Sequence, residues 1–317
     1  MTNFILIVVL FVTSIIFFLD AWINGSIVLL RCITWIRDRK ISLSDFIILN
    51  LALFRAILHG IPLLVSAVTI FYPQFRHLDI FLHIVDIFWM FTNNVNICLT
   101  SCLSVLYCLK IANFSNQAFL WLKRRISCVV VWILVGSLLY SCFSTLSGVL
   151  KFHFYSDKSQ MIFSRNHTEE IKRIKMHYFL LHFLGTLWSL IPLSLSLVSS
   201  VLLILSLVRH TRQMKHYSTG TRDLSTMAHV RATKVILFSF MLFIGYLLAS
   251  FLANSIFFFL HFVPAMIILS TIFTVFSSIQ TFALILENQK LKQAFLRMFQ
   301  VKRGRPKCRP LELSTKT

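Results

Sequence analysis

The sequence predicts an all-α membrane protein in which seven transmembrane helices form one bundle. Hydrophobic residues make up 57% of the 317 residues and charged residues only 13%, a balance that no water-soluble domain keeps without aggregating. The chain also contains seven apolar runs that reach the roughly 20 residues needed to cross the hydrocarbon core of a bilayer. These runs lie at about 4–30, 46–70, 80–109, 127–150, 179–208, 235–260 and 265–286. They leave no room for a soluble domain, so we expect one transmembrane domain over residues 1–317 that ends in a tail at 287–317.

The first two runs carry polar groups that require partners. The first run has no basic segment before it and no small-residue cleavage site near its end, so we interpret it as a retained helix and not as a signal peptide. The second run contains Arg55, a cation whose burial in the membrane without acceptors would be unfavourable. Asn24 in the first run lies at a compatible depth, so Asn24 and nearby carbonyls are the expected acceptors in a packing network.

The third run carries a polar stripe on one helical face. Its members, spaced 3, 4, 3 and 4 residues apart, are Asp86, Trp89, Asn93, Asn96 and Thr100. Because Asn and Asp are unfavourable against lipid, the stripe must face the bundle interior or a water-filled cavity. Trp89 offers a large flat surface and Asn93 both a donor and an acceptor, which favours a ligand cavity with Asp86 at its mouth. Two interpretations stay open for the deeper Asn96 and Thr100, namely cavity lining and hydrogen bonds between helices.

Two residues in the later runs bear on the same cavity. Pro192 in the fifth run removes a backbone hydrogen bond and predicts a kink that opens this half of the bundle. Tyr246 in the sixth run can direct its hydroxyl into the cavity. The alternative for Tyr246 is a tyrosine packed among phenylalanine side chains.

The distribution of the 31 Lys and Arg residues predicts the orientation of the helices. Most of them fall in alternate loops and in the tail, which places these segments on the cytoplasmic side and the N-terminus outside. The sequon Asn166-His167-Thr168 then lies in an outer loop, where luminal enzymes can glycosylate Asn166. The net charge of +20 is spread over the inner segments, where it faces anionic lipid and cytoplasmic partners, so we do not interpret it as a nucleic-acid surface.

The sequence indicates no metal, cofactor or disulfide site. None of the seven cysteines falls in a predicted outer loop, so no extracellular disulfide is expected. There is no CxxC pair and no His/Cys cluster at metal-ligand spacing, so we expect no bound metal and no cofactor. In the tail, KLKQAFLRMFQ at 290–300 has one apolar side flanked by Lys and Arg, which predicts a short amphipathic segment on the inner membrane face.

Long stretches of the chain resemble bitter taste receptors, the type 2 taste receptors. The stretch SCLSVLYCLKIANFSNQAFLWLKRRIS at 101–127 is similar to the segment that joins the third and fourth helices in that family. Further matches are NGSI at 24–27, ISLSDFIILNLALFR at 41–55, LILSLVRHTRQMKH at 203–216, GTRDLSTMAHVRATK at 220–234 and LILENQKLKQAF at 284–295. The chain shares with the family the lack of the DRY and NPxxY motifs and of the third-helix disulfide of rhodopsin-like receptors.

The resemblance implies a seven-helix G-protein-coupled receptor for bitter small molecules in the plasma membrane, and not an enzyme. It implies that Trp89 and Asn93 line the ligand pocket and that Tyr246 lies beneath it. Ser270 occupies a seventh-helix position where some members carry a pocket-facing acid. We expect Asn24 and Arg55 to belong to an activation network.

The resemblance also implies a cytoplasmic partner. The inner ends of the third, fifth and sixth helices are expected to admit a heterotrimeric G protein, gustducin or a related inhibitory-type protein, which leads to phospholipase C and calcium release. The candidate coupling residues are Tyr107, Lys110, Leu203, Ser206, Leu207, His210, His229 and Lys234.

The seventh run departs from the family pattern. Ser277, Gln280 and Glu287 stand where the family usually has Pro, His and Gly, so the usual contacts of that helix do not transfer directly. Two other functions stay open. One is another chemosensory receptor, such as a vomeronasal type 1 receptor, and the other is a seven-helix transporter, which should show internal repeats and paired broken helices.

Overall fold

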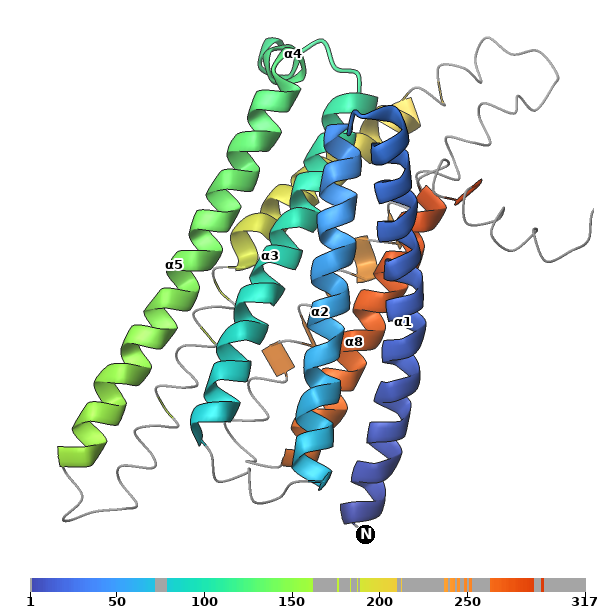
Figure 1. Ribbon diagram of the computed structural model, residues 1–317. Coiled ribbons are helices and arrows are strands. Elements are labelled where there is room, and N and C mark those ends of the chain that lie inside the picture. Colours follow the sequence, from blue (N-terminus) through green and yellow to red (C-terminus); the bar gives the residue numbers. More distant parts are fainter. Residues whose placement is uncertain are drawn as a thin grey trace, which may run out of the picture.

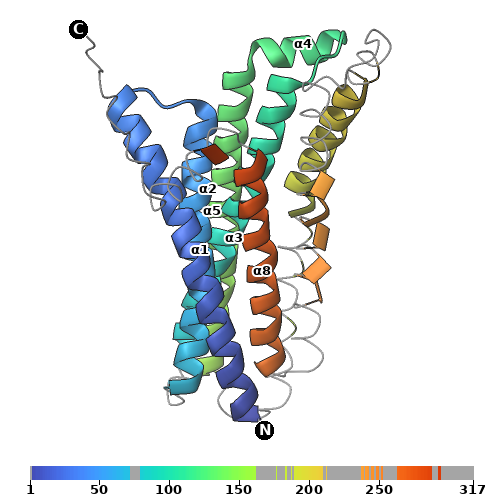
Figure 2. The same cartoon turned by 90° about the vertical axis from the view of Figure 1, so that its right-hand side faces the viewer.

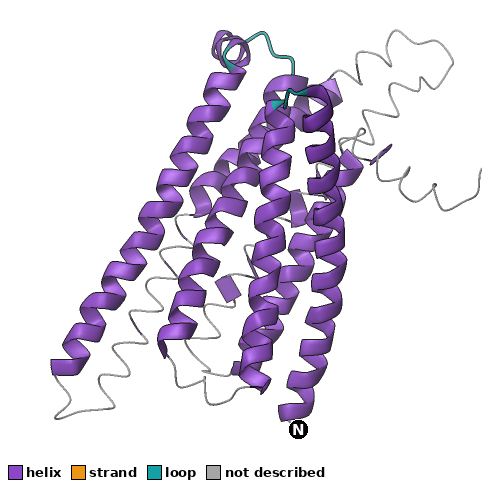
Figure 3. Cartoon of the chain, viewed as in Figure 1, coloured by secondary structure: helices purple, strands orange, loops and turns teal. Residues whose placement is uncertain are grey.

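The computed structural model describes residues 2–71, 79–161, 189–209 and 263–287. It also describes residues 176, 183, 187, 212, 237–238, 240–242, 244–245, 248–249, 251–252 and 292–293. Every regular element in these residues is a helix, as the colouring of Figure 3 shows. The predicted all-α fold is therefore confirmed for the described part of the chain.

The helices run along one another in an elongated bundle (Figure 1). The labelled helices are α1 (Thr2–Asp38), α2 (Leu43–Phe71), α3 (Asp79–Ile111), α4 (Gln117–Arg124), α5 (Ile126–Met161) and α8 (Val263–Glu287). A further helix, drawn in yellow, spans Ser189–Arg209. The described residues contain five helices long and apolar enough to cross a membrane, at Ile7–Asp38, Leu43–Val68, Ile87–Ile111, Ile126–Leu146 and Ser189–Arg209. The number seven stays a prediction, because most of the sixth run lies outside the described residues.

Two helices extend beyond their predicted ends. The apolar run of the first helix was expected to end at 30, but α1 continues to Asp38, and Arg31 on this extension forms an ion pair with Asp45 of α2 at 2.6 Å. The fourth run was expected to end at 150, whereas α5 continues to Met161. Both predictions were too short because they followed hydropathy, while a helix continues through polar residues as long as its backbone hydrogen bonds are made.

The short helix α4 has no counterpart in the prediction. It begins after Asn116, whose side chain caps the helix by accepting a hydrogen bond from the amide of Ala118 at 2.9 Å. Phe119 buries its ring against Phe114, and Lys123 donates to the carbonyl of Ala112 at 2.9 Å. With only eight residues, α4 contributes too little hydrophobic length to stand out from the basic loop around it.

The helix α3 lies at the centre of the bundle. It packs against α2 on one side and α5 on the other, and α8 packs against both α1 and α2 (Figure 2). Within an 18-residue apolar stretch of each candidate span, 72% of the residues are buried for α3, against 39% for α2, 17% for α1 and 11% for α5. The main hydrophobic core contains Ile27, Ile47, Ile48, Leu51, Ala52, Val95, Leu99, Cys102, Leu103, Leu106, Val130 and Ile285.

The helix at Ser189–Arg209 is tied to α3 by serine hydroxyls. Ser101 donates to the carbonyl of Pro192 at 2.7 Å, and Ser196 donates to the hydroxyl of Ser104 at 3.1 Å. A kink at Pro192 stays a prediction. The structure adds that this proline lies where its carbonyl accepts a hydrogen bond from α3, which fixes the register of the two helices.

Candidate functional site

The centre of the candidate site is Arg55, which is 1% exposed on α2. Its Nε donates to Asn96 Oδ1 at 3.1 Å, its Nη1 to Thr281 Oγ1 at 2.9 Å and its Nη2 to Gln280 Oε1 at 2.9 Å. A longer contact of 3.5 Å joins Nη2 to Thr100 Oγ1. The guanidinium of Arg55 therefore links α2 to α3 and to α8. Its planar group offers several N–H donors, which can reach acceptors on both helices at once.

The acceptor predicted for Arg55 was wrong. Asn24 directs its amide nitrogen to Asp20, with Nδ2 donating to Asp20 Oδ2 at 2.7 Å and to the Asp20 carbonyl at 3.1 Å. Asn24 Oδ1 is buried without a hydrogen-bond partner in the described part of the chain. Because Asp20 lies one helical turn before Asn24 on the same face of α1, the local carboxylate is the nearer partner.

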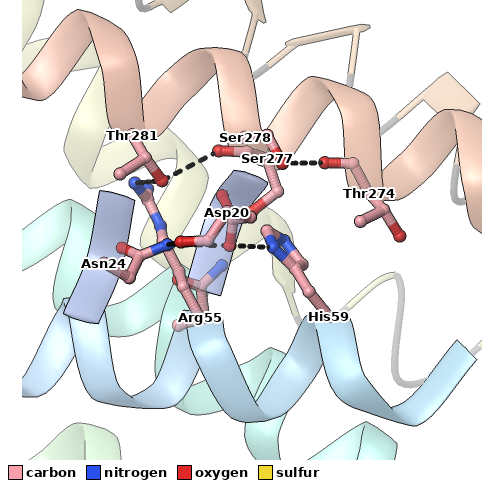
Figure 4. A network of polar contacts seen from close by, with 9 residues as sticks. Asp20, Asn24, Arg55, His59, Thr274, Ser277, Ser278 and Thr281 are labelled. Atoms are coloured by element: carbon pink, nitrogen blue, oxygen red, sulfur yellow. Dashed lines mark hydrogen bonds and ion pairs between the residues drawn. The ribbon is translucent and has the colours of Figure 1, made fainter. Parts of the chain in front are cut away.

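A second buried pair lies beside this network. His59 Nδ1 is hydrogen-bonded to Asp20 Oδ2, and the two side chains lie between α1 and α2 (Figure 4). Sequence reasoning missed Asp20, His59 and Thr281. A signal was present, since Asp20 is an acid within an apolar run and His59 follows Arg55 by four residues, which places it on the same helical face.

The polar stripe of α3 divides into two parts. Asn96 and Thr100 hydrogen-bond to Arg55, which confirms the interpretation that they join helices. Asn93 and Trp89 are half-buried, one and two turns away from Asn96 respectively. Trp89 packs against a small cluster formed by Ile97 and Ala249, together with Leu193 and Phe276. Trp89 therefore faces the bundle interior, where residues from three other segments of the chain pack against the same cluster.

The other predicted ligand residues are not all described. Asp86 lies on α3 and Ser270 on α8, but their side chains fall outside the described part of the structure. Tyr246 and the predicted glycosylation site Asn166 lie outside the described residues. Their roles stay predictions.

The predicted coupling residues that the structure describes lie near α4, at the end of the bundle opposite the N-terminus (Figure 1). Leu203 and Leu207 are buried in a second cluster with Val105, Cys108, Leu109, Ala112 and Phe119, and Tyr107 packs at its edge. Ser206 accepts a hydrogen bond from the amide of Asn113 at 3.0 Å. Lys110 is exposed, with Nζ 3.5 Å from Ser44 Oγ, and His210, His229 and Lys234 lie outside the described residues.

Comparison with known proteins decides the family. A family model described as "Taste receptor protein (TAS2R)" matches residues 1–303. The chain belongs to this taste receptor family. Among its relatives, "Taste receptor type 2 member 3" of Papio hamadryas is 45% identical over 285 residues, 89% of each chain. The proteins of the same name from Homo sapiens and Mus musculus are 44% and 42% identical over 292 residues, 91% of each chain.

Family membership confirms the resemblance inferred from the motifs. This taste receptor is a G-protein-coupled membrane receptor and not an enzyme. Its apolar helices and its relatives together indicate a multi-pass membrane protein. The vomeronasal receptor and the transporter, both of which the sequence left open, are set aside by the family match.

Proposed function

We propose that this taste receptor detects bitter small molecules and signals through gustducin or a related inhibitory-type G protein to phospholipase C and calcium release. The observation that carries the proposal is the family match over residues 1–303, which includes every segment assigned a role here.

The proposed place of action is the plasma membrane, with the N-terminus outside and Asn166 glycosylated. A faster band on a gel for Asn166→Gln, and an unchanged band after glycosidase treatment of that variant, would support this orientation.

The proposed ligand pocket is built around Trp89 and Asn93. Both side chains are half-buried, and Leu193 and Phe276, which pack against the same cluster as Trp89, supply apolar surface from two other helices. Such a mostly apolar enclosure with a few polar groups is typical of small-molecule sites. Asp86, Tyr246 and Ser270 complete the proposal as further polar groups at the pocket.

The proposed activation network is Arg55 with Asn24 and their partners. Arg55 contacts α3 at Asn96 and α8 at Thr281, so a shift of either helix changes its hydrogen bonds. An agonist acts by binding better to the active arrangement than to the inactive one, and only this difference in affinity shifts the equilibrium. Asn96 follows Asn93 by about one turn on the same helix. A small movement of α3 at the pocket therefore also changes the hydrogen bond between Asn96 and Arg55.

The proposed coupling surface lies at the α4 end of the bundle. Lys110 offers an exposed charge, and Tyr107, Leu203, Ser206 and Leu207 set the packing of α3 against the helix at Ser189–Arg209. The proposal assigns His210, His229 and Lys234 to the same surface. Opening of these helix ends would admit the G protein.

Calcium imaging tests the proposed function. Cells that express the full chain with a gustducin-type chimeric G protein are challenged with chemically diverse bitter compounds, and we expect a response that mock-transfected cells lack. With an agonist in hand, Trp89→Ala and Asn93→Ala should each raise the half-maximal concentration about tenfold or more, while surface expression is retained. This corresponds to about 1.4 kcal/mol of lost binding free energy.

The matched control for these variants is Phe88→Ala. Phe88 neighbours Trp89 on α3 but is 49% exposed on the outer side of the helix, so its truncation should leave potency unchanged. Equal potency of the Trp89 and Asn93 variants with the wild type would reject the pocket assignment. Silence of the wild type despite confirmed surface expression would count against the proposed ligand class or G protein.

A further inference from the structure

The connection between α1 and α2 carries an exposed serine behind two basic residues. Residues 39–42, with the sequence Arg-Lys-Ile-Ser, lie between the end of α1 and the start of α2 and are not helical. Arg39, Lys40 and Ser42 are all exposed. No hydrogen bond or ion pair joins the side chains of Arg39 and Lys40 to other residues in the described part of the chain. Both cations are therefore accessible to a partner.

The chain contains a second copy of this pattern, Arg-Arg-Ile-Ser at 124–127, in a different local structure. Its first residue ends α4 and its third residue begins α5, so it belongs almost entirely to helices. Ser127 is exposed as well, but it stands at the start of the apolar run at 127–150. Ser42 instead lies four residues before the nearest apolar run.

This difference decides which of the two serines a kinase can reach. Basophilic kinases are those that select their targets by basic residues two and three positions before the serine, and protein kinases bind the target segment in an extended form. Residues 39–42 lie outside the helices and can take this form. Residues 124–127 would first have to unwind the end of α4 and the start of α5, and Ser127 would have to leave the membrane boundary.

We propose that Ser42 is phosphorylated by a basophilic serine/threonine kinase of the cytoplasm. The proposal rests on the proposed orientation of the receptor, in which the α4 end of the bundle, where this connection lies (Figure 1), is cytoplasmic. In the reaction, Ser42 Oγ forms a bond to the γ-phosphorus of ATP while the bond from that phosphorus to the β–γ bridging oxygen breaks. ADP leaves, and the hydroxyl proton passes to a base of the kinase.

A phosphate on Ser42 is compatible with the start of α2. Ser42 Oγ accepts a hydrogen bond from the amide of Asp45 at 3.2 Å, which caps the helix. Phosphate oxygens can accept the same bond, and negative charge is favourable at a helix N-terminus. The opposing effect is repulsion by the Asp45 carboxylate, whose Oδ2 now accepts from the Ser42 hydroxyl at 2.7 Å. Asp45 keeps a partner, because its Oδ1 pairs with Arg31 at 2.6 Å.

The same contacts connect Ser42 to Lys110 of α3. Ser42 Oγ lies 3.0 Å from Ser44 Oγ, which in turn lies 3.5 Å from Lys110 Nζ. A phosphate on Ser42 is therefore close enough to attract the Lys110 ammonium group and to form a charge-assisted hydrogen bond with it. Lys110 belongs to the proposed coupling surface, so phosphorylation should withdraw its charge from the G protein and weaken the signal.

Peptide-mapping mass spectrometry tests the site. The full chain in lipid nanodiscs is incubated with ATP and the catalytic subunit of cyclic-AMP-dependent kinase, a basophilic enzyme. We expect phosphate on Ser42 and at least about tenfold less on Ser127, whose segment must unwind first. Synthetic peptides of the two segments lack this constraint and should both react.

Two variants assign the signal to one hydroxyl. Ser42→Gly removes the acceptor but keeps a residue that begins helices nearly as well, so phosphate on this segment should vanish. Ser44→Ala removes the other hydroxyl of the same segment and should leave the phosphate in place.

Several results overturn the proposal. It fails if Ser42 stays unmodified in nanodiscs while the free peptide reacts, because the fold then blocks the kinase, or if the free peptide does not react at all. Phosphate on Ser44 in place of Ser42 also rejects it. Equal phosphate on Ser42 and Ser127 would reject the argument from local structure.

Calcium imaging tests the expected effect on coupling separately from the site. Activation of the kinase in cells should lower the maximal agonist response of the wild type, and this loss should be absent in Ser42→Gly. An equal loss in both would assign the regulation to another residue. The mass spectrometry requires neither an agonist nor a G protein, so a silent receptor would count against the proposed function and not against Ser42.

Discussion

The helices α3 and α5 lie side by side but occupy opposite environments. In an 18-residue apolar stretch of each span, 72% of the α3 residues are buried, whereas only 11% of the α5 residues are buried. Yet α3 is the more polar of the two and carries the run Thr92, Asn93, Asn94 and Asn96. In a water-soluble protein the more apolar helix would lie inside. In a bilayer the lipid is as apolar as leucine, so polar groups gain most from the interior and apolar groups can face outward.

The hydrogen bonds of the two helices show the same contrast. On α3, Asn96 accepts from Arg55 and Ser101 donates to Pro192, so these polar groups connect neighbouring helices. On α5, Ser141 and Thr145 donate to carbonyls of their own helix at 2.9 and 2.8 Å. The large residues of α5 face outward, with Trp132 72% and Phe143 73% exposed. The helix α3 therefore holds the bundle together, while α5 mainly provides a surface for lipid.

The largest expected effect is that of Asn96→Leu on α3. Loss of Asn96 Oδ1 leaves the Nε of Arg55 buried without this acceptor, and hydrogen bonds to charged groups contribute about 1.5–3 kcal/mol. The midpoint of thermal unfolding of the detergent-purified protein should fall clearly. The matched change on α5 is Thr145→Val, which removes a hydroxyl bonded only within its own helix, and it should shift the midpoint little. Equal shifts of the unfolding midpoint in the two variants would contradict the contrast between α3 and α5.

A smaller contrast is expected for two leucines. Leu106 of α3 is fully buried in the main core, whereas Leu139 of α5 is 67% exposed. Leu106→Ala should lower the free energy of unfolding by about 2 kcal/mol, the low end of the range for such cavities, because the reference environment is lipid and not water. Leu139→Ala should lie within about 0.5 kcal/mol of the wild type. A larger loss for Leu139 would reveal a protein contact on the α5 surface.

The smallest effect is expected where the two helices meet. Asn94 Nδ2 of α3 donates to Ser144 Oγ of α5 at 3.4 Å, near the limit for a hydrogen bond. A double-mutant cycle of Asn94→Ala and Ser144→Ala should give a coupling energy of about 0.6 kcal/mol, the average for polar pairs between membrane helices. A coupling energy above about 1.5 kcal/mol would mean that α5 is held by specific bonds and would weaken its description as a lipid surface.

The contacts predicted best were those of charged or polar residues within apolar runs, because such side chains must be hydrogen-bonded inside a membrane. Arg55 had to be satisfied inside the membrane, and the stripe of α3 supplied Asn96 and Thr100 on the correct face. The partner was misassigned because depth in the membrane does not say which way a side chain turns, and Asn24 turns to Asp20. The helix α4 was missed because its formation rests on a cap at Asn116 and on the burial of Phe119, and neither produces a hydropathy signal.

The sequence by itself determined that this receptor is an all-helical membrane protein and which face of α3 is polar. These features follow from local physics, because an apolar run must satisfy its own backbone hydrogen bonds in lipid and because helical periodicity assigns residues to faces. Only the tertiary structure decided that Arg55 meets Thr281 and Gln280 and that His59 meets Asp20. Those contacts join residues up to 226 positions apart, and they depend on the rotation and depth of each helix in the packed bundle.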